Sequence, residues 1–166
     1  MTPSSCDNQP PRLDPAGPIH LIVPLRPGAD LEQLRARLTG VQALQQRSVH
    51  WHVPGARADI VQLAASAVDS ARRDGGLVVA AGGDGTINEV VNGLARRAAE
   101  GPALGIVPLG TANVLAHELG LGFSAAAVAQ TLTAGREILM QPGEASGQGR
   151  TRQFSLMAGA GFDAKV

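Results

Sequence analysis

The chain has 166 residues, and its 14 lysines and arginines balance its 14 aspartates and glutamates. This length is enough for one domain with a buried core, and the single cysteine, Cys6, excludes an internal disulfide framework and a cysteine-built zinc site. The neutral balance of charge gives no long-range attraction for nucleic acid or for an anionic membrane, so we expect no nucleic-acid partner.

Residues 1–18 contain five prolines among small polar residues. They cannot bury enough apolar area to offset the entropy lost on ordering, so we predict a disordered leader. The leader lacks the apolar core of a signal peptide, and no run of about 18 apolar residues occurs that would span a bilayer. We therefore expect a cytoplasmic protein without a transmembrane segment, in which any membrane contact is peripheral, at the inner face.

From residue 19 onward, short apolar runs alternate with segments of helical periodicity. This alternation predicts the α/β class, with an open, mostly parallel sheet and helices on both of its faces, over residues 19–135. The predicted strands are residues 19–25, 49–53, 77–81 and 103–107. The predicted helices are residues 31–44, 60–71, 87–99, 114–119 and 125–134.

Local signals mark several helix ends. Gly75 and Gly76 predict left-handed geometry that stops the second helix. Thr86 and Glu89 have the spacing of a capping box at the start of the third helix. Ser124 is predicted to cap the last helix.

The pattern changes after residue 135. Residues 136–141 and 153–158 are predicted to be strands, separated by a polar, glycine-containing hairpin or crossover loop over residues 142–152. We interpret residues 136–166 as the beginning of a second, β-rich domain.

The strand at residues 77–81 runs into a turn that is rich in glycine, Gly82-Gly83-Asp84-Gly85-Thr86. Glycines let the main chain turn sharply and approach a ligand closely, and the helix that follows points unpaired N–H groups at the same place. This layout predicts a phosphate-binding site. The alternative is a tight turn in which Thr86 only caps the helix.

Asp84 lies inside this turn, where phosphate would repel its carboxylate by about 4 kcal/mol per unit charge at about 4 Å. A divalent cation between the two groups would offset this repulsion, and Asp84 could instead orient or deprotonate an attacking hydroxyl. Both explanations point to phosphoryl transfer, with Asp84 as a catalytic residue and a metal ligand. A capping or turn role is the alternative.

A second turn, which contains Gly110, Thr111 and Asn113, follows the next predicted strand. Because the carboxyl ends of parallel strands share one edge of the sheet, the two turns are expected to form two walls of one crevice. We therefore predict that all three residues bind nucleotide or phosphate together with the first turn. An ordinary loop with an N-cap is the alternative.

His50 and His52 flank Trp51, so both imidazoles are expected on one face of a strand, where two metal ligands would converge. No third ligand follows at a familiar spacing, so an exposed or edge-strand position is the preferred interpretation. His117 and Glu118 lack the second histidine of a zinc protease helix.

Three segments resemble, in order, the catalytic domain of the diacylglycerol kinase family, which also includes sphingosine kinases, ceramide kinases and bacterial lipid kinases. They are the first glycine turn with Asn88-Glu89-Val90 and Asn92-Gly93 after it, Pro108-Leu109-Gly110-Thr111-Ala112-Asn113, and Gly159-Ala160-Gly161-Phe162-Asp163-Ala164. The run over residues 113–120 is most similar to bacterial lipid kinases.

This resemblance implies the ATP-binding domain of a two-domain lipid kinase, with a fold shared by NAD kinase and diacylglycerol kinase. It implies ATP and Mg²⁺ as cofactors, a diacylglycerol-like or sphingoid lipid at the membrane surface as phosphoryl acceptor, and a catalytic role for Asp163, for which a turn role is the alternative. Most of the lipid-binding domain would be missing after residue 166. The apolar face left open there makes a homodimer an option.

One segment departs from the family pattern. The first strand of the family ends in an asparagine and a proline, whereas residues 23–28 here read Val-Pro-Leu-Arg-Pro-Gly, with Gly28 as the remaining match. Two alternatives stay open beside the lipid kinase: an incomplete nucleotide-binding fragment without activity, and a soluble-substrate kinase of the NAD kinase type. The segment with Asp163 is unexpected for the latter.

Overall fold

The computed structural model describes residues 16–25, 32, 35, 47–97 and 103–159. The predicted leader up to residue 15 and most of the helix predicted over residues 31–44 lie outside this part of the chain. The same holds for Gly28 and for the segment that contains Asp163.

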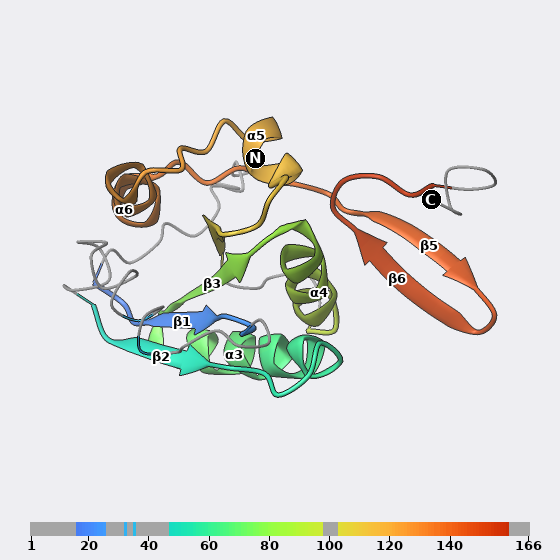
Figure 1. Ribbon diagram of the computed structural model, residues 1–166. Helices are drawn as coiled ribbons and strands as arrows, with labels where there is room; N and C mark the ends of the chain where they lie inside the picture. The colour runs from blue at the N-terminus through green and yellow to red at the C-terminus, as the bar shows by residue number, and fades with distance from the viewer. Residues whose placement is uncertain (1–15, 26–31, 33–34, 36–46, 98–102, 160–166) are drawn as a thin grey trace, which may run out of the picture.

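Four short strands form one parallel sheet in the order β2-β1-β3-β4 (Figure 1). The strands are β1 Ile19–Ile22, β2 Val49–His52, β3 Leu77–Gly82 and β4 Leu104–Pro108. The first residue of β1, Ile19, pairs with the first residues of β2 and β3. The predicted α/β class with a parallel sheet is confirmed, although β1 ends three residues earlier than predicted.

Each face of the sheet carries its own hydrophobic cluster, because successive strand residues point to opposite faces. Ile22 and Ala80 pack with α3 and α4 on one face, whereas Leu21 and Val79 pack with α6 on the other. Because the two clusters lie on opposite faces of the sheet, the prediction of helices on both faces is confirmed. The helices are α3 Asp59–Asp74, α4 Asp84–Ala95, α5 Val114–Glu118 and α6 Ala125–Ala134.

Two of the predicted helix ends are confirmed. Gly75 follows α3 with a φ of 69°, a left-handed value that glycine adopts without strain. Ser124 precedes α6, and its Oγ accepts a hydrogen bond from the N–H of Ala127 at 3.2 Å. The local sequence signals therefore fix these boundaries.

The capping box predicted for Thr86 and Glu89 is wrong. α4 begins at Asp84, three residues before the predicted start, and no side chain caps its N-terminus. The N–H groups of Thr86 and Ile87 donate to the carbonyl of Gly83. The glycine turn itself thus supplies the first turn of α4, and Glu89 lies too far along the helix to reach its start.

The two strands predicted after residue 135 are misplaced. Residues 136–141 form no strand, and an antiparallel hairpin of β5 Gly143–Gly147 and β6 Arg150–Phe154 lies mostly in the segment predicted to be a loop. The turn residues Gln148 and Gly149 have φ values of 51° and 71°, as a two-residue type I′ turn requires. Because both strands are polar and largely exposed, the hydrophobic pattern did not reveal them.

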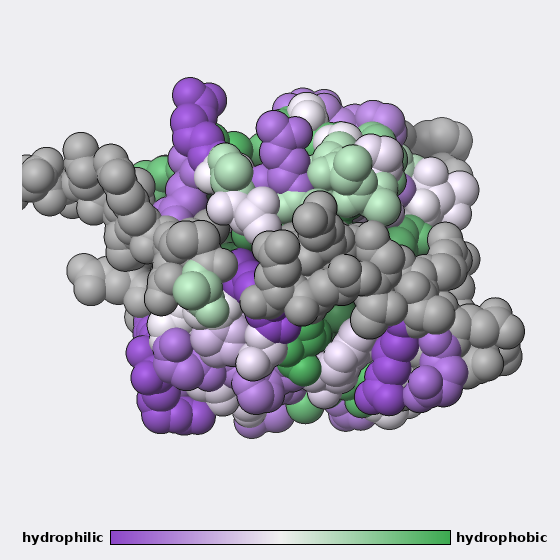
Figure 2. Space-filling model, turned by 90° about the vertical axis from the view of Figure 1, so that its left-hand side faces the viewer, coloured by the Kyte–Doolittle hydropathy of each residue, from purple (hydrophilic) through white to green (hydrophobic). Residues whose placement is uncertain are grey.

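The surface differs from one part of the described chain to another. None of the helices that the structure describes is long and apolar enough to cross a membrane. On the face in Figure 2, the described residues of the lower half are mostly hydrophilic, and pale green surface appears at the level of α6. Among the described residues, the exposed large hydrophobic side chains lie after β4, namely Phe123, Ile138, Leu139, Met140 and Met157.

Gly93 allows α3 and α4 to pack closely, which gives a first prediction. A Cβ atom at Gly93 would overlap the Ala64 side chain and lie 2.7 Å from the carbonyl oxygen of Val61. Gly93→Ala is expected to lower the free energy of unfolding by about 1–3 kcal/mol, because the helices must move apart. Urea denaturation measures this change. Gly147→Ala is the control, since a Cβ atom there meets nothing within 4 Å; equal losses would contradict the close packing.

Candidate functional site

The two glycine turns touch at the carboxyl edge of the sheet. They follow β3 and β4, which are paired neighbours, and the N–H of Leu109 donates to the carbonyl of Gly82 at 3.0 Å. A Cβ atom at Gly83 would lie 3.0 Å from the Cα atom of Gly110, and one at Gly110 would overlap Gly83. Glycine is needed on both sides because the two main chains are in contact. The prediction that the two turns lie together is confirmed, although no residue of the second turn lines the cavity described below.

The carboxylate of Asp84 joins the two turns. Its Oδ2 and Oδ1 accept hydrogen bonds from the backbone N–H groups of Val114 and Leu115, each at 3.0 Å. These N–H groups lie in the first turn of α5, where they have no partner within the helix. A side chain from the first glycine turn therefore fixes the start of the helix that follows the second.

Asn113 closes the second turn and is only 5% exposed. Its Oδ1 accepts a hydrogen bond from the N–H of Gly110, and its Nδ2 donates to the carbonyl of Gly110, both at 2.8 Å. Its φ of 47° lies in the left-handed region, which asparagine adopts more readily than most residues. The amide of Asn113 thus shapes the turn, whereas Thr111 is exposed.

A cavity of about 340 Å³ lies beside the first turn. It is lined by segments that follow three strands, with Pro24 and Leu25 after β1, residues 54–57 after β2, and Gly83, Gly85 and Thr86 after β3. All of these segments leave the carboxyl ends of parallel strands. The cavity therefore opens at the edge where an open α/β sheet binds its ligands.

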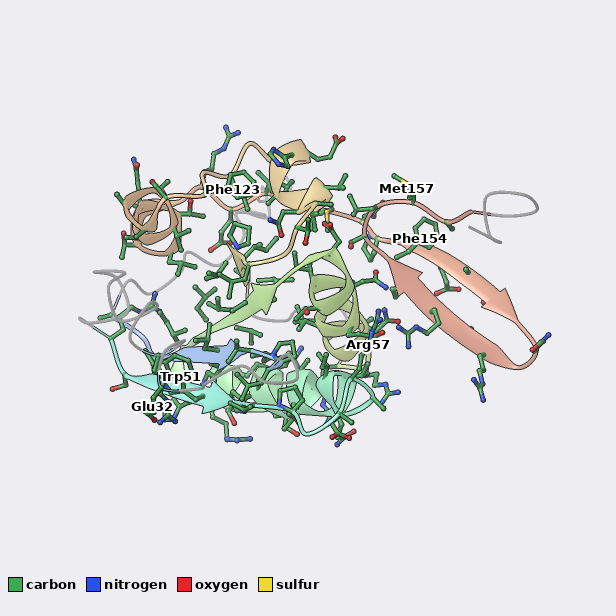
Figure 3. All side chains as sticks on the ribbon, viewed as in Figure 1. Glu32, Trp51, Arg57, Phe123, Phe154 and Met157 are labelled. Atoms are coloured by element: carbon green, nitrogen blue, oxygen red, sulfur yellow. The ribbon has the colours of Figure 1, made fainter. Side chains whose placement is uncertain are left out.

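Arg57 is a cation in the lining of this cavity that the sequence analysis missed. A Cβ atom at Gly85 would lie 3.1 Å from its Nη2, so the guanidinium lies against the glycine turn. Its Nε lies 3.6 Å from Oε1 of Glu89, and 72% of its side chain is exposed. Figure 3 shows Arg57 on the side of the molecule that faces the β5–β6 hairpin. The sequence signal that could have identified Arg57 is its position as a basic residue shortly after the second predicted strand.

Glu89 connects the cavity to the hairpin. It is 9% exposed, and its Oε2 accepts a hydrogen bond from Nη2 of Arg152 in β6 at 2.8 Å. Its other oxygen faces Arg57. Glu89 therefore lies between two arginines from different elements, which explains why a buried carboxylate is tolerated at this position.

Two asparagines of α4 also bind the hairpin. Oδ1 of Asn92 accepts a hydrogen bond from the N–H of Gln153, and Nδ2 of Asn92 donates to the carbonyl of Gln153, both at 2.9 Å. Oδ1 of Asn88 accepts a hydrogen bond from the N–H of Ser155 at 3.2 Å. The polar residues that follow the glycine turn thus dock β6 onto α4.

The residues predicted to bind nucleotide or phosphate, together with the predicted catalytic residue Asp163, fall into three groups. Gly83, Gly85 and Thr86 line the cavity. Gly82, Asp84, Gly110, Thr111 and Asn113 belong to the turns beside it and are not part of its lining. Asp163 lies outside the part of the chain that the structure describes.

The bridge made by Asp84 gives a second prediction. Asp84→Asn replaces one acceptor oxygen by an NH₂ group and leaves one N–H at the start of α5 without its partner. The free energy of unfolding is expected to fall by about 1–3 kcal/mol, as measured by urea denaturation. Asp59→Asn is the control, because Oδ2 of Asp59 accepts one hydrogen bond, from the N–H of Ala56, which an amide oxygen can retain. A smaller loss in Asp84→Asn than in Asp59→Asn would contradict the bridge.

Known proteins share both the sequence and the fold of this chain. A protein of Escherichia fergusonii named "Probable lipid kinase YegS" is 35% identical over 153 residues, which cover 90% of this chain and 48% of that protein. A diacylglycerol kinase of Bacillus subtilis strain 168 is 54% identical over 56 residues, which cover 34% of this chain and 18% of the enzyme. The chain thus spans about half the length of this relative.

A solved structure shows the same fold. The crystal structure of a diacylglycerol kinase from Bacillus anthracis strain Sterne superposes with a TM-score of 0.58 at 24% identity, and the match covers 81% of this chain and 45% of that one.

The family model of the diacylglycerol kinase catalytic domain matches residues 21–145, which include the cavity and both glycine turns. By the extent of this match, the chain belongs to the diacylglycerol kinase catalytic domain family.

Proposed function

We propose that this chain is the nucleotide-binding part of an ATP-dependent lipid kinase, which transfers the γ-phosphoryl group to the hydroxyl of a diacylglycerol-like or sphingoid lipid. The observation that carries the proposal is the contact between the two glycine turns beside a cavity at the carboxyl edge of the sheet. Membership of the diacylglycerol kinase catalytic domain family supports the lipid as acceptor.

The first turn is suited to hold the phosphates of ATP. Gly83 and Gly85 expose main chain to the cavity, and Thr86 offers a hydroxyl there. Arg57 supplies positive charge at the same place, since its guanidinium lies against Gly85. Gly82 and the second turn, with Gly110 and Thr111, would form the adjoining wall, whose shape Asn113 maintains.

Asp84 is the residue we assign to magnesium. It is the only acidic residue in the two turns over residues 82–86 and 108–113. Mg²⁺ prefers one or two carboxylates together with phosphate oxygens, and an Asp84 oxygen that accepts one N–H retains lone-pair capacity. When bound, Mg²⁺ would offset the charge of the phosphates. The hydrogen bonds from Val114 and Leu115 hold the carboxylate in a fixed orientation for this role.

The chemistry requires positioning and charge neutralisation rather than a covalent enzyme intermediate. In our proposal Asp84 and Asp163 form the catalytic set, and the acceptor hydroxyl comes from a lipid at the membrane surface. The docking of β6 onto α4 through Glu89 and Asn92 links the nucleotide side of the molecule to the hairpin. A homodimer remains a prediction that light scattering can test.

Binding of ATP tests the role of Arg57. Arg57→Gln is expected to weaken the affinity for ATP with Mg²⁺ by about tenfold, which corresponds to about 1.4 kcal/mol, because a cation facing the phosphates is lost. The affinity for adenosine should not change. Isothermal titration calorimetry measures both constants. Arg150→Gln, in the exposed hairpin, is the control. A failure of ATP to bind at millimolar concentration, or equal losses in both variants, would refute the site.

Phosphoryl transfer tests the whole proposal. The chain is incubated with γ-labelled ATP, Mg²⁺ and vesicles that contain diacylglycerol or sphingosine, with NAD as a soluble acceptor in a parallel reaction. We expect label in lipid, and at least a hundredfold less of it with Asp84→Asn under conditions in which that variant is folded. Label in NAD would favour the soluble-substrate kinase instead. ATP binding without transfer to any acceptor would identify a nucleotide-binding module that needs a further domain.

A further inference from the structure

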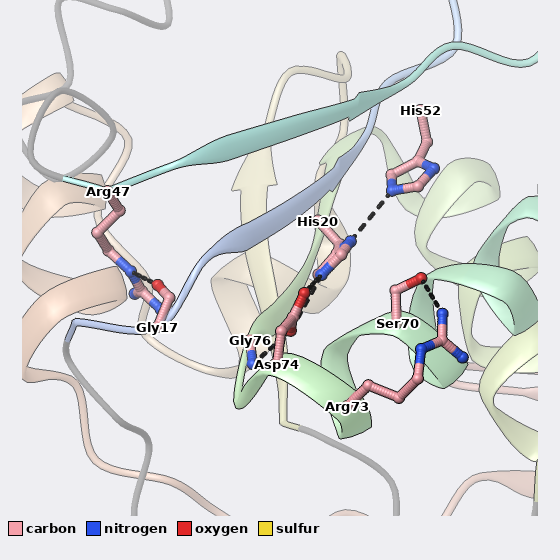
Figure 4. Close-up of polar contacts among 8 residues, drawn as sticks. All are labelled: Gly17, His20, Arg47, His52, Ser70, Arg73, Asp74 and Gly76. Atoms are coloured by element: carbon pink, nitrogen blue, oxygen red, sulfur yellow. Dashed lines mark hydrogen bonds and ion pairs between the residues drawn. The ribbon is translucent and has the colours of Figure 1, made fainter.

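Three of the four histidines of the chain gather on one face of the sheet. His20 in β1 is the register partner of His50 in β2, and His52 lies two residues further along the same strand. β2 is an edge strand, and the end of α3 lies beside this face. Figure 4 shows His20 between His52 and Asp74, the last residue of α3.

The donor atoms of this cluster lie close together. Nε2 of His20 is 3.0 Å from Oδ2 of Asp74, and the rings of His20 and His50 stack with centroids 4.9 Å apart. One ligand atom from each of His20, His50 and Asp74 lies within 4.8 Å of the other two. A zinc ion with bonds of about 2.0–2.2 Å holds its ligand atoms about 3.3–3.6 Å apart. To close the site, the exposed side chain of His50 would have to turn its ring out of the stack with His20 and bring its ligand atom about 1 Å closer to the other two.

A second set of contacts orients the two inner ligands. Oδ1 of Asp74 accepts a hydrogen bond from the N–H of Gly76 at 3.0 Å, which turns Oδ2 toward His20. Nδ1 of His20 lies 3.3 Å from Nε2 of His52. Contacts of this kind fix the tautomer of a ligating histidine.

We propose that His20, His50 and Asp74 form a zinc-binding site, with His52 holding the ring of His20 in place. Two imidazoles and one carboxylate suit Zn²⁺ and other late first-row metals better than Mg²⁺. A structural hydrogen bond between His20 and Asp74 would account for one contact of the buried histidine, but it leaves the stacked His50 unexplained. His50 and Asp74 are exposed, so a fourth ligand position faces solvent.

The site lies away from the cavity. His20 and His50 are the second residues of their strands, whereas the cavity is lined by residues that follow the strand ends. A metal ion here would tie the edge strand β2 to β1 and to the end of α3. Its effect is therefore expected on stability rather than on phosphoryl transfer, and its test does not depend on the proposed kinase activity.

Zinc titration of the untagged, chelator-stripped chain tests the proposal. Calorimetry is expected to show a single equivalent of Zn²⁺ bound, with a raised melting temperature, and millimolar Mg²⁺ should not displace the ion. Cobalt(II) should give the strong visible absorption of a low-coordinate site. His50→Gln and Asp74→Asn should each weaken zinc binding at least about tenfold, because each removes one ligand.

His117→Gln is the matched control, since the fourth histidine lies in α5, outside the cluster, where it packs against Phe123. This variant should bind zinc like the unmodified chain. Circular dichroism confirms that each variant is folded before titration, and because His50 and Asp74 are exposed, their replacement leaves the core intact. Equal affinity in His50→Gln and the unmodified chain, equal losses in His117→Gln, or displacement of zinc by magnesium would overturn the site.

Discussion

The contact between Gly83 and Gly110 constrains everything around the candidate site. β3 and β4 are hydrogen-bonded neighbours, so the chains that leave their ends start only about 5 Å apart and would collide if both turns carried side chains. Glycine on each side removes this conflict. Asp84 then fixes the remaining freedom, because its carboxylate accepts hydrogen bonds from the first N–H groups of α5. The two turns are therefore held together by a main-chain hydrogen bond and by the carboxylate of Asp84.

α4 connects the first glycine turn to the sheet, to α3 and to the hairpin. One of its faces packs on the sheet and on α3, with Gly93 at the closest approach. Its polar residues Asn88, Glu89 and Asn92 bind β6 and its flanking main chain. Glu89 also faces Arg57 at the cavity. A single helix thus connects the glycine turn at its start to the hairpin along its side.

Different types of side chain gather at the two ends of the parallel strands. At the carboxyl ends, Arg57 and the glycine turn line the cavity at which we propose that the phosphates of ATP bind. Near the beginning of β1 and β2, imidazoles and a carboxylate gather instead. Nitrogen and carboxylate donors favour transition metals, whereas phosphates with one carboxylate favour magnesium. The two sites would therefore select different cations in the same solution.

The sequence by itself determined the elements whose signals are local. Apolar periodicity predicted the parallel sheet and its helices, and glycines after two successive strands predicted two turns at one edge.

Only the tertiary structure decided which side chains contact residues that lie far away in the sequence. Glu89 has the spacing of a capping residue but binds Arg152, 63 residues away, and His50 gains His20 and Asp74 as neighbours through strand pairing and the end of α3. The strands of the β5–β6 hairpin were predicted at the wrong positions for a related reason. They are polar, and they are held to the molecule by hydrogen bonds to α4, which no pattern within residues 143–154 encodes.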